Sequence, residues 1–165
     1  MPATSAALKI TRLRSPARLK AAAALMAASD PWRRLGIDEE RCLGALRGPF
    51  RETYAAHSGG RFAGLAAVAM YGTFKGYIQA LFVAEGFRGR GVGERLLAAA
   101  EKRIFRESPN VFLCVSSFNS GARRFYRRLG YAEIGLLRNL VREGLHEVLL
   151  RKTKGPLGGR KGKNG

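Results

Sequence analysis

Cysteine and histidine are scarce in this sequence, which has only two of each among its 165 residues. Cys42 and Cys114 lie far apart, and neither they nor His57 and His146 show the short spacings of a zinc site. The sequence therefore predicts no metal centre. Because isolated cysteines are typical of reducing compartments, we expect a cytoplasmic protein.

The sequence also lacks a long hydrophobic run. No apolar stretch approaches the ~20 residues that a helix needs to cross a bilayer, so we expect no membrane segment. Residues 21–27 are apolar and follow a basic segment, as in an export signal, but they are rich in alanine rather than leucine. A strand-like segment, residues 8–11, precedes them. We therefore expect residues 21–27 to belong to an ordinary amphipathic helix.

Acidic residues are few: 12 Asp and Glu stand against 30 Lys and Arg, which gives a formal net charge of +18. A chain this basic attracts polyanions, and these include a phosphorylated cofactor, nucleic acid, the ribosome and acidic protein surfaces. Cations and glycines are concentrated at the C-terminal end. We therefore expect residues 154–165 to form a disordered basic tail. Residues 1–153 have the length of a single domain.

The order of strands and helices follows from hydrophobic periodicity and from turn residues. Strands are expected at residues 7–13, 51–57, 61–71, 77–83, 111–117, 131–141 and 145–152, and helices at residues 16–29, 38–46, 92–104 and 121–129. The order β-α-α-β-β-β-α-β-α-β-β predicts an α/β (α+β) fold, with a mixed, mostly antiparallel twisted sheet flanked by helices. The helix between strands 77–83 and 111–117 makes these two strands parallel, joined by a right-handed crossover.

Glycine and arginine crowd the loop between strand 77–83 and the helix that follows. The loop contains Gly86, Arg88, Gly89, Arg90, Gly91 and Gly93. The first amides of a helix have no partner within it, and the helix dipole adds partial positive charge there. Glycine lets the backbone close around an anion and arginine adds donors, so we expect a bound phosphate or pyrophosphate. The loop fits neither a Walker loop, which needs Gly-Lys-Ser/Thr, nor the G-x-G-x-x-G of dinucleotide-binding proteins.

A second motif begins at Asn119, directly after strand 111–117, and runs N-x-x-A-x-x-F-Y-x-x-L-G-Y. Its apolar residues recur at i, i+3, i+4 and i+7, which predicts a buried helix face made of Ala122, Phe125, Tyr126 and Leu129. On its own the motif is explained by core packing. Combined in this order with R-x-x-G-x-G at Arg88, Gly91 and Gly93, it resembles the GNAT superfamily of N-acetyltransferases. The resemblance spans residues 8–152.

The resemblance implies acetyl-CoA as co-substrate. In GNAT proteins the two parallel strands splay apart at their C-terminal ends, and the pantetheine arm of acetyl-CoA enters the gap. The positions that match the family's cofactor site are Leu81, Phe82, Val83, Arg88, Gly89, Arg90, Gly91, Val92, Gly93, Asn119 and Tyr126. By this match, backbone groups of the first three bind the pantetheine and the loop amides bind the pyrophosphate. Tyr126 also matches the general acid, which protonates the departing thiolate of coenzyme A.

The resemblance leaves the general base open. Relatives that acetylate the N-termini of ribosomal proteins carry a glutamate on the strand before the Asn motif, where this sequence has Cys114. Strand 77–83 has no carboxylate either, although its Gln79 could orient a water. Glu147, on the last strand, is our candidate base. The alternative is that Glu147 is an ordinary surface or hairpin charge.

The sequence thus predicts an enzyme that transfers acetyl from acetyl-CoA to a primary amine by direct attack. Fixed backbone donors stabilise the negative charge that builds on the thioester oxygen, and positioning of the two reactants makes a covalent intermediate unnecessary. The acceptor stays open between a small molecule and a protein N-terminus or lysine. Residues 30–34, with Trp32 as a possible wall, and residues 142–144 are expected to border it.

Two alternatives to this enzyme remain. The missing base favours a non-catalytic module that binds or senses acyl-CoA, whereas the retained Asn119 and Tyr126 favour catalysis. The strong positive charge favours an RNA-directed enzyme that acetylates aminoacyl-tRNA and whose RNA binding falls steeply with salt. The chain is expected to be a monomer or a homodimer.

Overall fold

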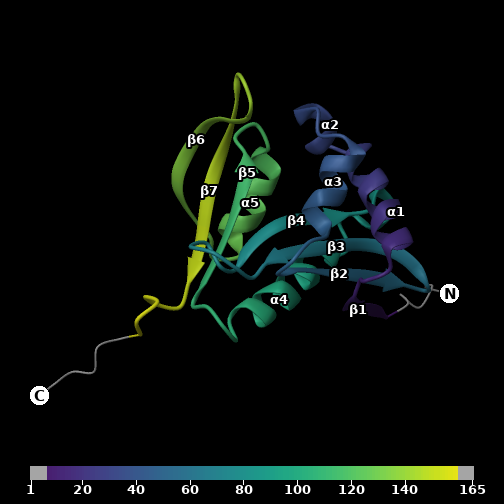
Figure 1. Cartoon of the computed structure of the whole chain (residues 1–165), viewed down its shortest axis with the longest axis horizontal. Coiled ribbons are helices and arrows are strands. Elements are labelled where there is room, and N and C mark those ends of the chain that lie inside the picture. The colour runs from purple at the N-terminus through teal and green to yellow at the C-terminus, as the bar shows by residue number, and fades with distance from the viewer. Residues whose placement is uncertain (1–6, 160–165) are drawn as a thin grey trace, which may run out of the picture.

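The computed structural model of the chain describes residues 7–159 (Figure 1). The strands are β1 (Leu8–Arg12), β2 (Arg51–Ser58), β3 (Arg61–Ala69), β4 (Tyr77–Val83), β5 (Asn110–Ser116), β6 (Ala132–Arg142) and β7 (Leu145–Thr153). The helices are α1 (Pro16–Ala27), α2 (Trp32–Leu35), α3 (Glu39–Leu46), α4 (Val92–Ile104) and α5 (Ser120–Arg128), with a 3-10 turn, η1, at Glu85–Phe87. The strands form one sheet in the order β1-β2-β3-β4-β5-β7-β6.

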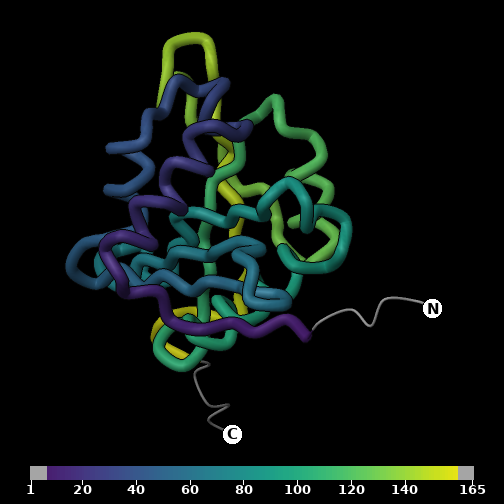
Figure 2. The backbone as a smooth tube through the Cα atoms, turned by 90° about the vertical axis from the view of Figure 1, so that its right-hand side faces the viewer, coloured from purple at the N-terminus to yellow at the C-terminus, as the bar shows by residue number. Residues whose placement is uncertain are grey.

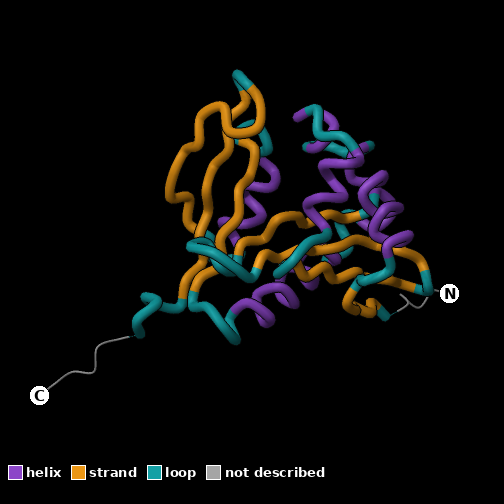
Figure 3. Tube along the Cα trace, viewed as in Figure 1, coloured by secondary structure: helices purple, strands orange, loops and turns teal. Residues whose placement is uncertain are grey.

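The sheet is antiparallel except at β4 and β5, which run parallel and pair only where both begin. The register joins Tyr77 to Phe112, and the Phe112 amide donates a hydrogen bond of 3.1 Å to the Gly76 carbonyl. Beyond that point the pairing stops, and Figure 1 and Figure 3 show the strands diverging into two groups, β1–β4 and β5–β7–β6. The predicted mixed sheet with a splayed parallel pair is therefore confirmed.

Gly76 allows β4 and β5 to start in contact. Its φ is +92°, and a Cβ built on it would lie 2.5 Å from the Asn110 carbonyl oxygen and 2.5 Å from Ile104 Cγ2. Neither a left-handed backbone nor such a close approach suits a residue with a side chain. A glycine at this position is therefore part of what brings the two strands together before they separate.

The helices cover both faces of the sheet. α1 and α3 bury Met26 and Leu46 against Leu65 and Phe82 on one face of the β1–β4 half. α4 covers the opposite face, and the five apolar residues that its helical spacing places on one side are all buried: Val92, Leu96, Leu97, Ala100 and Ile104. In the side view of Figure 2, the purple and blue segments of α1–α3 lie to the left of the strands and the green segment of α5 lies to the right. In this view α1–α3 and α5 thus flank the strands on opposite sides.

Two short elements were not predicted, α2 and η1. A helix of four residues makes about one turn, so it shows no hydrophobic periodicity. Gly36, with φ of +69°, ends α2. The bounds of β4 and α4 are those predicted, and the other bounds differ from the predicted ones by at most two residues; α1, for example, ends at Ala27 and not at residue 29. Such differences are usual at frayed element ends.

The beginning of the predicted tail is attached to the domain. The Lys154 amide donates a hydrogen bond of 2.8 Å to the Pro109 carbonyl, and the Lys154 ammonium lies 4.1 Å from the centre of the Phe105 ring. The rest of the tail that we expected to be disordered, residues 160–165, lies outside the described residues. No helix within residues 7–159 is both long enough and apolar enough to cross a membrane.

Candidate active site

Two cavities lie along the gap where β4 and β5 diverge. The large cavity, of about 790 Å³, is lined by the end of β4, the first turn of α4 and one side of α5. The small cavity, of about 350 Å³, is lined by α2, α3, β4, β5 and the β6–β7 hairpin. The residues common to both linings are Pro31, Trp32, Leu81, Asn119, Ala122 and Tyr126. The two cavities therefore adjoin at these residues.

The first turn of α4 and the loop before it line the large cavity. Gly89, with φ of +71°, and Gly91, with φ of +74°, have left-handed backbones, and Gly91 is the N-cap of α4. A glycine cap has no side chain to accept from the first amides of the helix. These amides are therefore available to an anion in the cavity.

The two loop arginines lie apart. Arg88 lines the large cavity, and its Nε donates a hydrogen bond of 3.3 Å to the carbonyl of Val83 at the end of β4. Arg90 lines a separate hollow together with Arg95. All the other residues that the sequence assigned to the cofactor line the large cavity. The side chain of Arg90 is thus the one member of that set that the structure places elsewhere.

The edge of β4 that faces β5 is open beyond Tyr77. Leu81 pairs with Ala66 of β3, and no described strand pairs with the other edge of β4 along residues 81–83. A bulge leaves Gln79 without a partner residue on β3, which bends the strand just before this edge. Free backbone N–H and C=O groups at a strand edge can bind an extended amide-containing chain in the way a neighbouring strand would.

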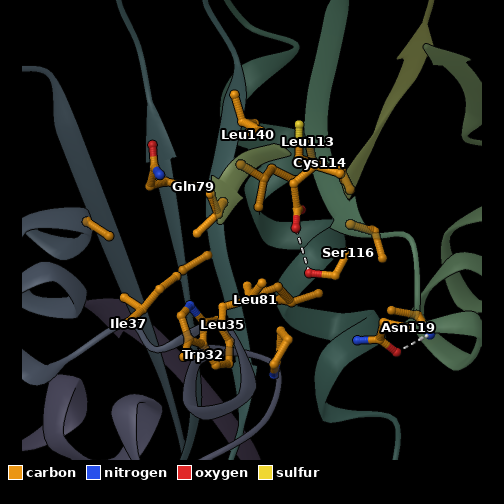
Figure 4. Close-up of a pocket in the computed structure, with 18 of the residues that line it drawn as sticks. Trp32, Leu35, Ile37, Gln79, Leu81, Leu113, Cys114, Ser116, Asn119 and Leu140 are labelled. Atoms are coloured by element: carbon orange, nitrogen blue, oxygen red, sulfur yellow. Dashed lines mark hydrogen bonds between the residues drawn. The ribbon is translucent and has the colours of Figure 1, made fainter. Parts of the chain in front are cut away.

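Asn119 and Tyr126 come to the junction of the cavities from opposite ends of α5. Asn119 is the N-cap of α5, and its Oδ1 accepts a hydrogen bond of 3.1 Å from the Ala122 amide. Figure 4 shows its amide nitrogen turned away from the helix, toward the cavity. Tyr126 is only 7% exposed, and burial raises the pKa of its phenol. Tyr126 therefore stays protonated at neutral pH.

The predicted core face of α5 is only partly buried. Among its four residues, Tyr126 is buried, whereas Ala122, Phe125 and Leu129 are half-buried. The reason is that Ala122 and Phe125 line the large cavity instead of packing fully into the core. The same helical spacing predicts a core face and a cavity wall, so the sequence pattern alone did not distinguish them.

Glu147 lies at the small cavity and is only 6% exposed, so it is not the surface charge that the sequence left as an alternative. It stands opposite Ser116 in the β5–β7 register, and Ser116 Oγ donates a hydrogen bond of 2.6 Å to Glu147 Oε1 (Figure 4). Burial raises the pKa of this carboxyl, and the bond from Ser116 partly opposes that rise. A buried carboxylate with a raised pKa is a stronger proton acceptor than an exposed one.

Cys114 lines the small cavity and is half-buried. It contacts the side chain of Tyr77, which lines the same cavity. Burial raises the pKa of the Cys114 thiol, and burial together with the bond to Cys114 raises the pKa of Tyr77. Both groups are therefore neutral near pH 7. Glu147 is left as the one carboxyl group in the described lining of the small cavity.

A wide bulge in β6 forms one wall of the small cavity. Leu137 pairs with Glu147 and Arg142 pairs with Leu145, so residues 138–141 face a single residue of β7, His146. Asn139 has φ of +54°, and its amide donates a hydrogen bond of 3.1 Å to His146 Nδ1. The bulge brings Leu140 and Val141 into the cavity lining.

Of the two segments expected to border the acceptor, one lines the cavities and the other does not. Pro31 and Trp32 line both cavities, and Trp32 packs edge-on against Phe82 with 5.9 Å between ring centres. The β6–β7 turn at residues 142–144 is not part of the lining, and the bulge before it takes that place. The sequence offered one weak signal for the bulge, because asparagine tolerates a left-handed backbone better than most residues.

Comparisons with known proteins agree with this geometry. Residues 17–131 match the sequence model of the family described as the acetyltransferase (GNAT) family. The chain is similar to the N-alpha-acetyltransferase RimI of Mycobacterium tuberculosis, with 30% identity over 137 residues, which cover 81% of this chain and 82% of the relative.

Solved structures share the fold at low sequence identity. The ribosomal-protein-S18-alanine N-acetyltransferase of Escherichia coli superposes with a TM-score of 0.73 at 18% identity, over 96% of this chain and 98% of that one. An aminoglycoside 6'-N-acetyltransferase in complex with coenzyme A superposes with a TM-score of 0.71 at 18% identity, over 90% of this chain and 98% of that one. At such identities the likeness concerns the fold alone.

Proposed function

Because the chain belongs to the acetyltransferase (GNAT) family and is an acetyl-CoA-dependent N-acetyltransferase, we propose that it acetylates a primary amine by direct attack on the thioester. One observation carries this proposal. The large and small cavities adjoin at Leu81, Asn119 and Tyr126, and a buried carboxylate, Glu147, lies on the small-cavity side. A cofactor in one cavity and an amine in the other would meet at this junction.

The large cavity offers one set of groups that suits the pyrophosphate of acetyl-CoA and another that suits its pantetheine arm. The free amides around Gly91 and the guanidinium of Arg88 fit a pyrophosphate. The open edge of β4 at residues 81–83 fits the amide groups of pantetheine, and the outward amide nitrogen of Asn119 offers a further donor. This arrangement would place the thioester between β4 and β5, beside Tyr126.

The small cavity supplies the proton acceptor. In the proposed reaction, Glu147 takes a proton from the attacking amine as the nitrogen bonds to the thioester carbon. A backbone amide at the free edge of β4 stabilises the oxyanion. The bond between carbon and sulfur then breaks, and the Tyr126 phenol gives its proton to the departing thiolate. Solvent then takes the proton from Glu147 and restores the proton on Tyr126. Because the amine attacks the thioester directly, no covalent enzyme intermediate forms.

The acceptor amine is proposed to be the α-amino group of a polypeptide. The similarity to an N-alpha-acetyltransferase of Mycobacterium tuberculosis supports this choice over an amino sugar. The alternative of a non-catalytic acyl-CoA sensor is disfavoured by Glu147, since an ionised carboxyl buried without a catalytic use destabilises the fold. The cytoplasm stays our predicted location.

Release of coenzyme A in the presence of short peptides, free amino acids and amino sugars tests the proposal. We expect peptides with a free N-terminus to accelerate release, with the acetyl group located on the α-nitrogen by mass spectrometry. N-terminally blocked copies of the same peptides are the control and should be inactive. Release that no amine accelerates would contradict the proposal.

A further inference from the structure

Four arginines surround the small cavity without a carboxylate partner: Arg34, Arg41, Arg51 and Arg142. None of them forms an ion pair with any carboxylate within residues 7–159. Their guanidinium groups are therefore not engaged by a carboxylate of the described residues. Any anion that enters or rims this cavity meets guanidinium groups from several elements.

Two of these arginines belong to the α3 and β2 side of the cavity. Arg41 of α3 is part of the cavity lining. Arg51, at the start of β2, donates from Nη1 to Oε1 of Gln79 at 2.9 Å, and Gln79 is also part of the lining. The Nε of Arg51 is buried and has no hydrogen-bond partner among the described groups. Arg51 thus has an unused donor next to the cavity, which is costly unless a ligand or water binds it.

The other two arginines come from the opposite sides of the mouth. Arg142 reaches from the end of β6 toward α2, and its Nη1 lies 3.7 Å from the position that a Cβ on Gly36 would take. Arg34 of α2 stacks on the ring of Phe118, with 3.9 Å between the guanidinium carbon and the ring centre. Gly36 and Phe118 are sequence neighbours of cavity-lining residues. Arg34 and Arg142 therefore bridge the elements that frame the mouth.

Some carboxylates of the protein are paired outside the small cavity, and others lie near its mouth without an arginine partner. Glu52 pairs with Arg12 and Arg103, and Glu133 pairs with Arg123, all outside the small cavity. Near the mouth, the Asp38 carboxylate caps α3, Asp30 pairs with Arg33, and three exposed acidic residues have no arginine partner: Glu39, Glu40 and Glu143. In the cavity itself, the carboxylate of Glu147 is held by Ser116. Arg41 and Glu147 are the charged side chains in the described lining of the cavity, and the four arginines at and around it keep guanidinium groups that form no ion pair.

We propose that the acceptor is an anionic amine: a primary amine with one or more carboxylates close to it, as at the N-terminus of an acidic polypeptide. The inference rests on the proposed amine acetylation. The amine would reach Glu147, while the neighbouring carboxylates bind the arginines, whose planar guanidinium groups match carboxylates in shape and charge. A polycationic acceptor such as an aminoglycoside meets the same arginines as like charges and is repelled.

A matched set of acceptors tests the inference. Two peptides begin with alanine and differ only in carrying Glu or Gln at the second and third residues; free glutamate and an aminoglycoside complete the set. We expect kcat/KM to be about tenfold or more higher for the Glu peptide than for the Gln peptide, mainly through KM, with the ratio shrinking at high salt. If free glutamate is acetylated with the same kcat/KM as the Glu peptide, the anionic amine is a free amino acid and not a polypeptide N-terminus.

Variants link the preference to the arginines. Arg41→Gln and Arg51→Gln should each lower the Glu-to-Gln peptide ratio several-fold, whereas Arg106→Gln, which removes an exposed arginine without an ion pair beyond α4, should leave it unchanged. Because the ratio is internal to each variant, a partly unfolded preparation does not alter it. Equal kcat/KM for the two peptides, or a preference for the aminoglycoside, would overturn the inference while amine acetylation stands. Absence of transfer to every acceptor would instead refute the proposed function.

Discussion

Ser116 and Glu147 face each other across the β5–β7 pair, and the serine hydroxyl donates a hydrogen bond of 2.6 Å to the glutamate at the wall of the small cavity. Cys114, two residues earlier on β5, occupies the position at which the family resemblance led us to look for a glutamate base. The carboxylate in this chain comes instead from the adjacent strand. The catalytic role proposed for Glu147 therefore rests on a carboxylate that β7 supplies in place of β5.

Glu147→Gln is expected to lower kcat/KM by about 10²- to 10⁴-fold, the usual contribution of a general base. Glutamine keeps the shape of the side chain and an oxygen for the Ser116 bond, so the fold should be preserved. The measurement is steady-state release of coenzyme A at saturating acetyl-CoA. A decrease in kcat/KM of less than threefold would show that Glu147 is not the general base.

The raised pKa of Glu147 gives a prediction for stability with a definite sign. A carboxyl whose pKa is higher in the folded than in the unfolded state favours folding when protonated, and this contribution is lost as pH rises through the folded-state pKa. At neutral pH the ionised Glu147 therefore costs stability. Glu147→Gln should keep or raise Tm at pH 7.5, and Ser116→Ala, which removes only the hydrogen bond, is the comparison. A large fall in Tm for Glu147→Gln would contradict the assignment.

The same pKa shift predicts the acid limb of the pH–rate profile. Activity should fall as pH decreases through a pKa that lies above the ordinary carboxyl value of 4.5. In Glu147→Gln this limb should disappear from whatever activity remains. If the acid limb of the pH–rate profile is the same in the variant as in the wild type, it reports the ionisation of another group.

Tyr126→Phe is expected to lower kcat by about 10²- to 10⁴-fold, with little change in the affinity for acetyl-CoA. The ring contacts with Phe125 and Tyr131, at 5.1 Å and 5.5 Å between centres, do not involve the hydroxyl, so the fold should remain. Because burial raises the pKa of Tyr126, its ionisation should not limit the rate up to about pH 10, the usual value for tyrosine. Unchanged kcat in the variant would rule out the general-acid role.

Gly91→Ala should weaken binding of acetyl-CoA, because φ of +74° is strained by about 1–2 kcal/mol in a residue with a Cβ and because the loop amides would shift. Gly86→Ala is the matched control, since Gly86 has open space around it and no left-handed backbone. Isothermal titration with acetyl-CoA measures both. Equal affinities for the two variants would argue against an anion at this helix start.

Gly76→Ala should destabilise the fold by about 3 kcal/mol or more, because its Cβ would collide with the Asn110 carbonyl and with Ile104. Gly72→Ala is the control, with a similar φ of +84° and open space around the position. Denaturant unfolding compares the two. If both variants lose the same stability, backbone strain explains the whole effect. The collision of a Cβ where β4 and β5 begin would then contribute nothing.

The parts of the site that local sequence determines were the parts that could be predicted. The glycines around Gly91 determine the backbone of a single loop. The spacing of the apolar residues in α4 identifies the side of the helix that is buried, so both features can be read from a short stretch of chain. The parallel pairing of β4 and β5 followed from one crossover helix. These features depend on neighbouring residues and on general rules of chain topology.

The acceptor side depends on contacts between distant residues and could not be predicted in the same way. The burial of Glu147 results from its register with Ser116 of β5, and the bulge at residues 138–141 results from how β6 pairs with β7. The unpaired state of Arg51 depends on where every carboxylate lies in the folded chain. No local pattern encodes these relations, so the sequence suggested Glu147 without showing its burial.

The most direct test of the central claim is a crystal structure with coenzyme A bound. The account predicts that the diphosphate contacts the amides from Gly89 to Gly93 and that the sulfur lies within about 3.5 Å of the Tyr126 hydroxyl, the distance that proton transfer requires. It also predicts that the sulfur faces the small cavity and Glu147. A diphosphate bound elsewhere, or a sulfur remote from both Tyr126 and the small cavity, would contradict the account.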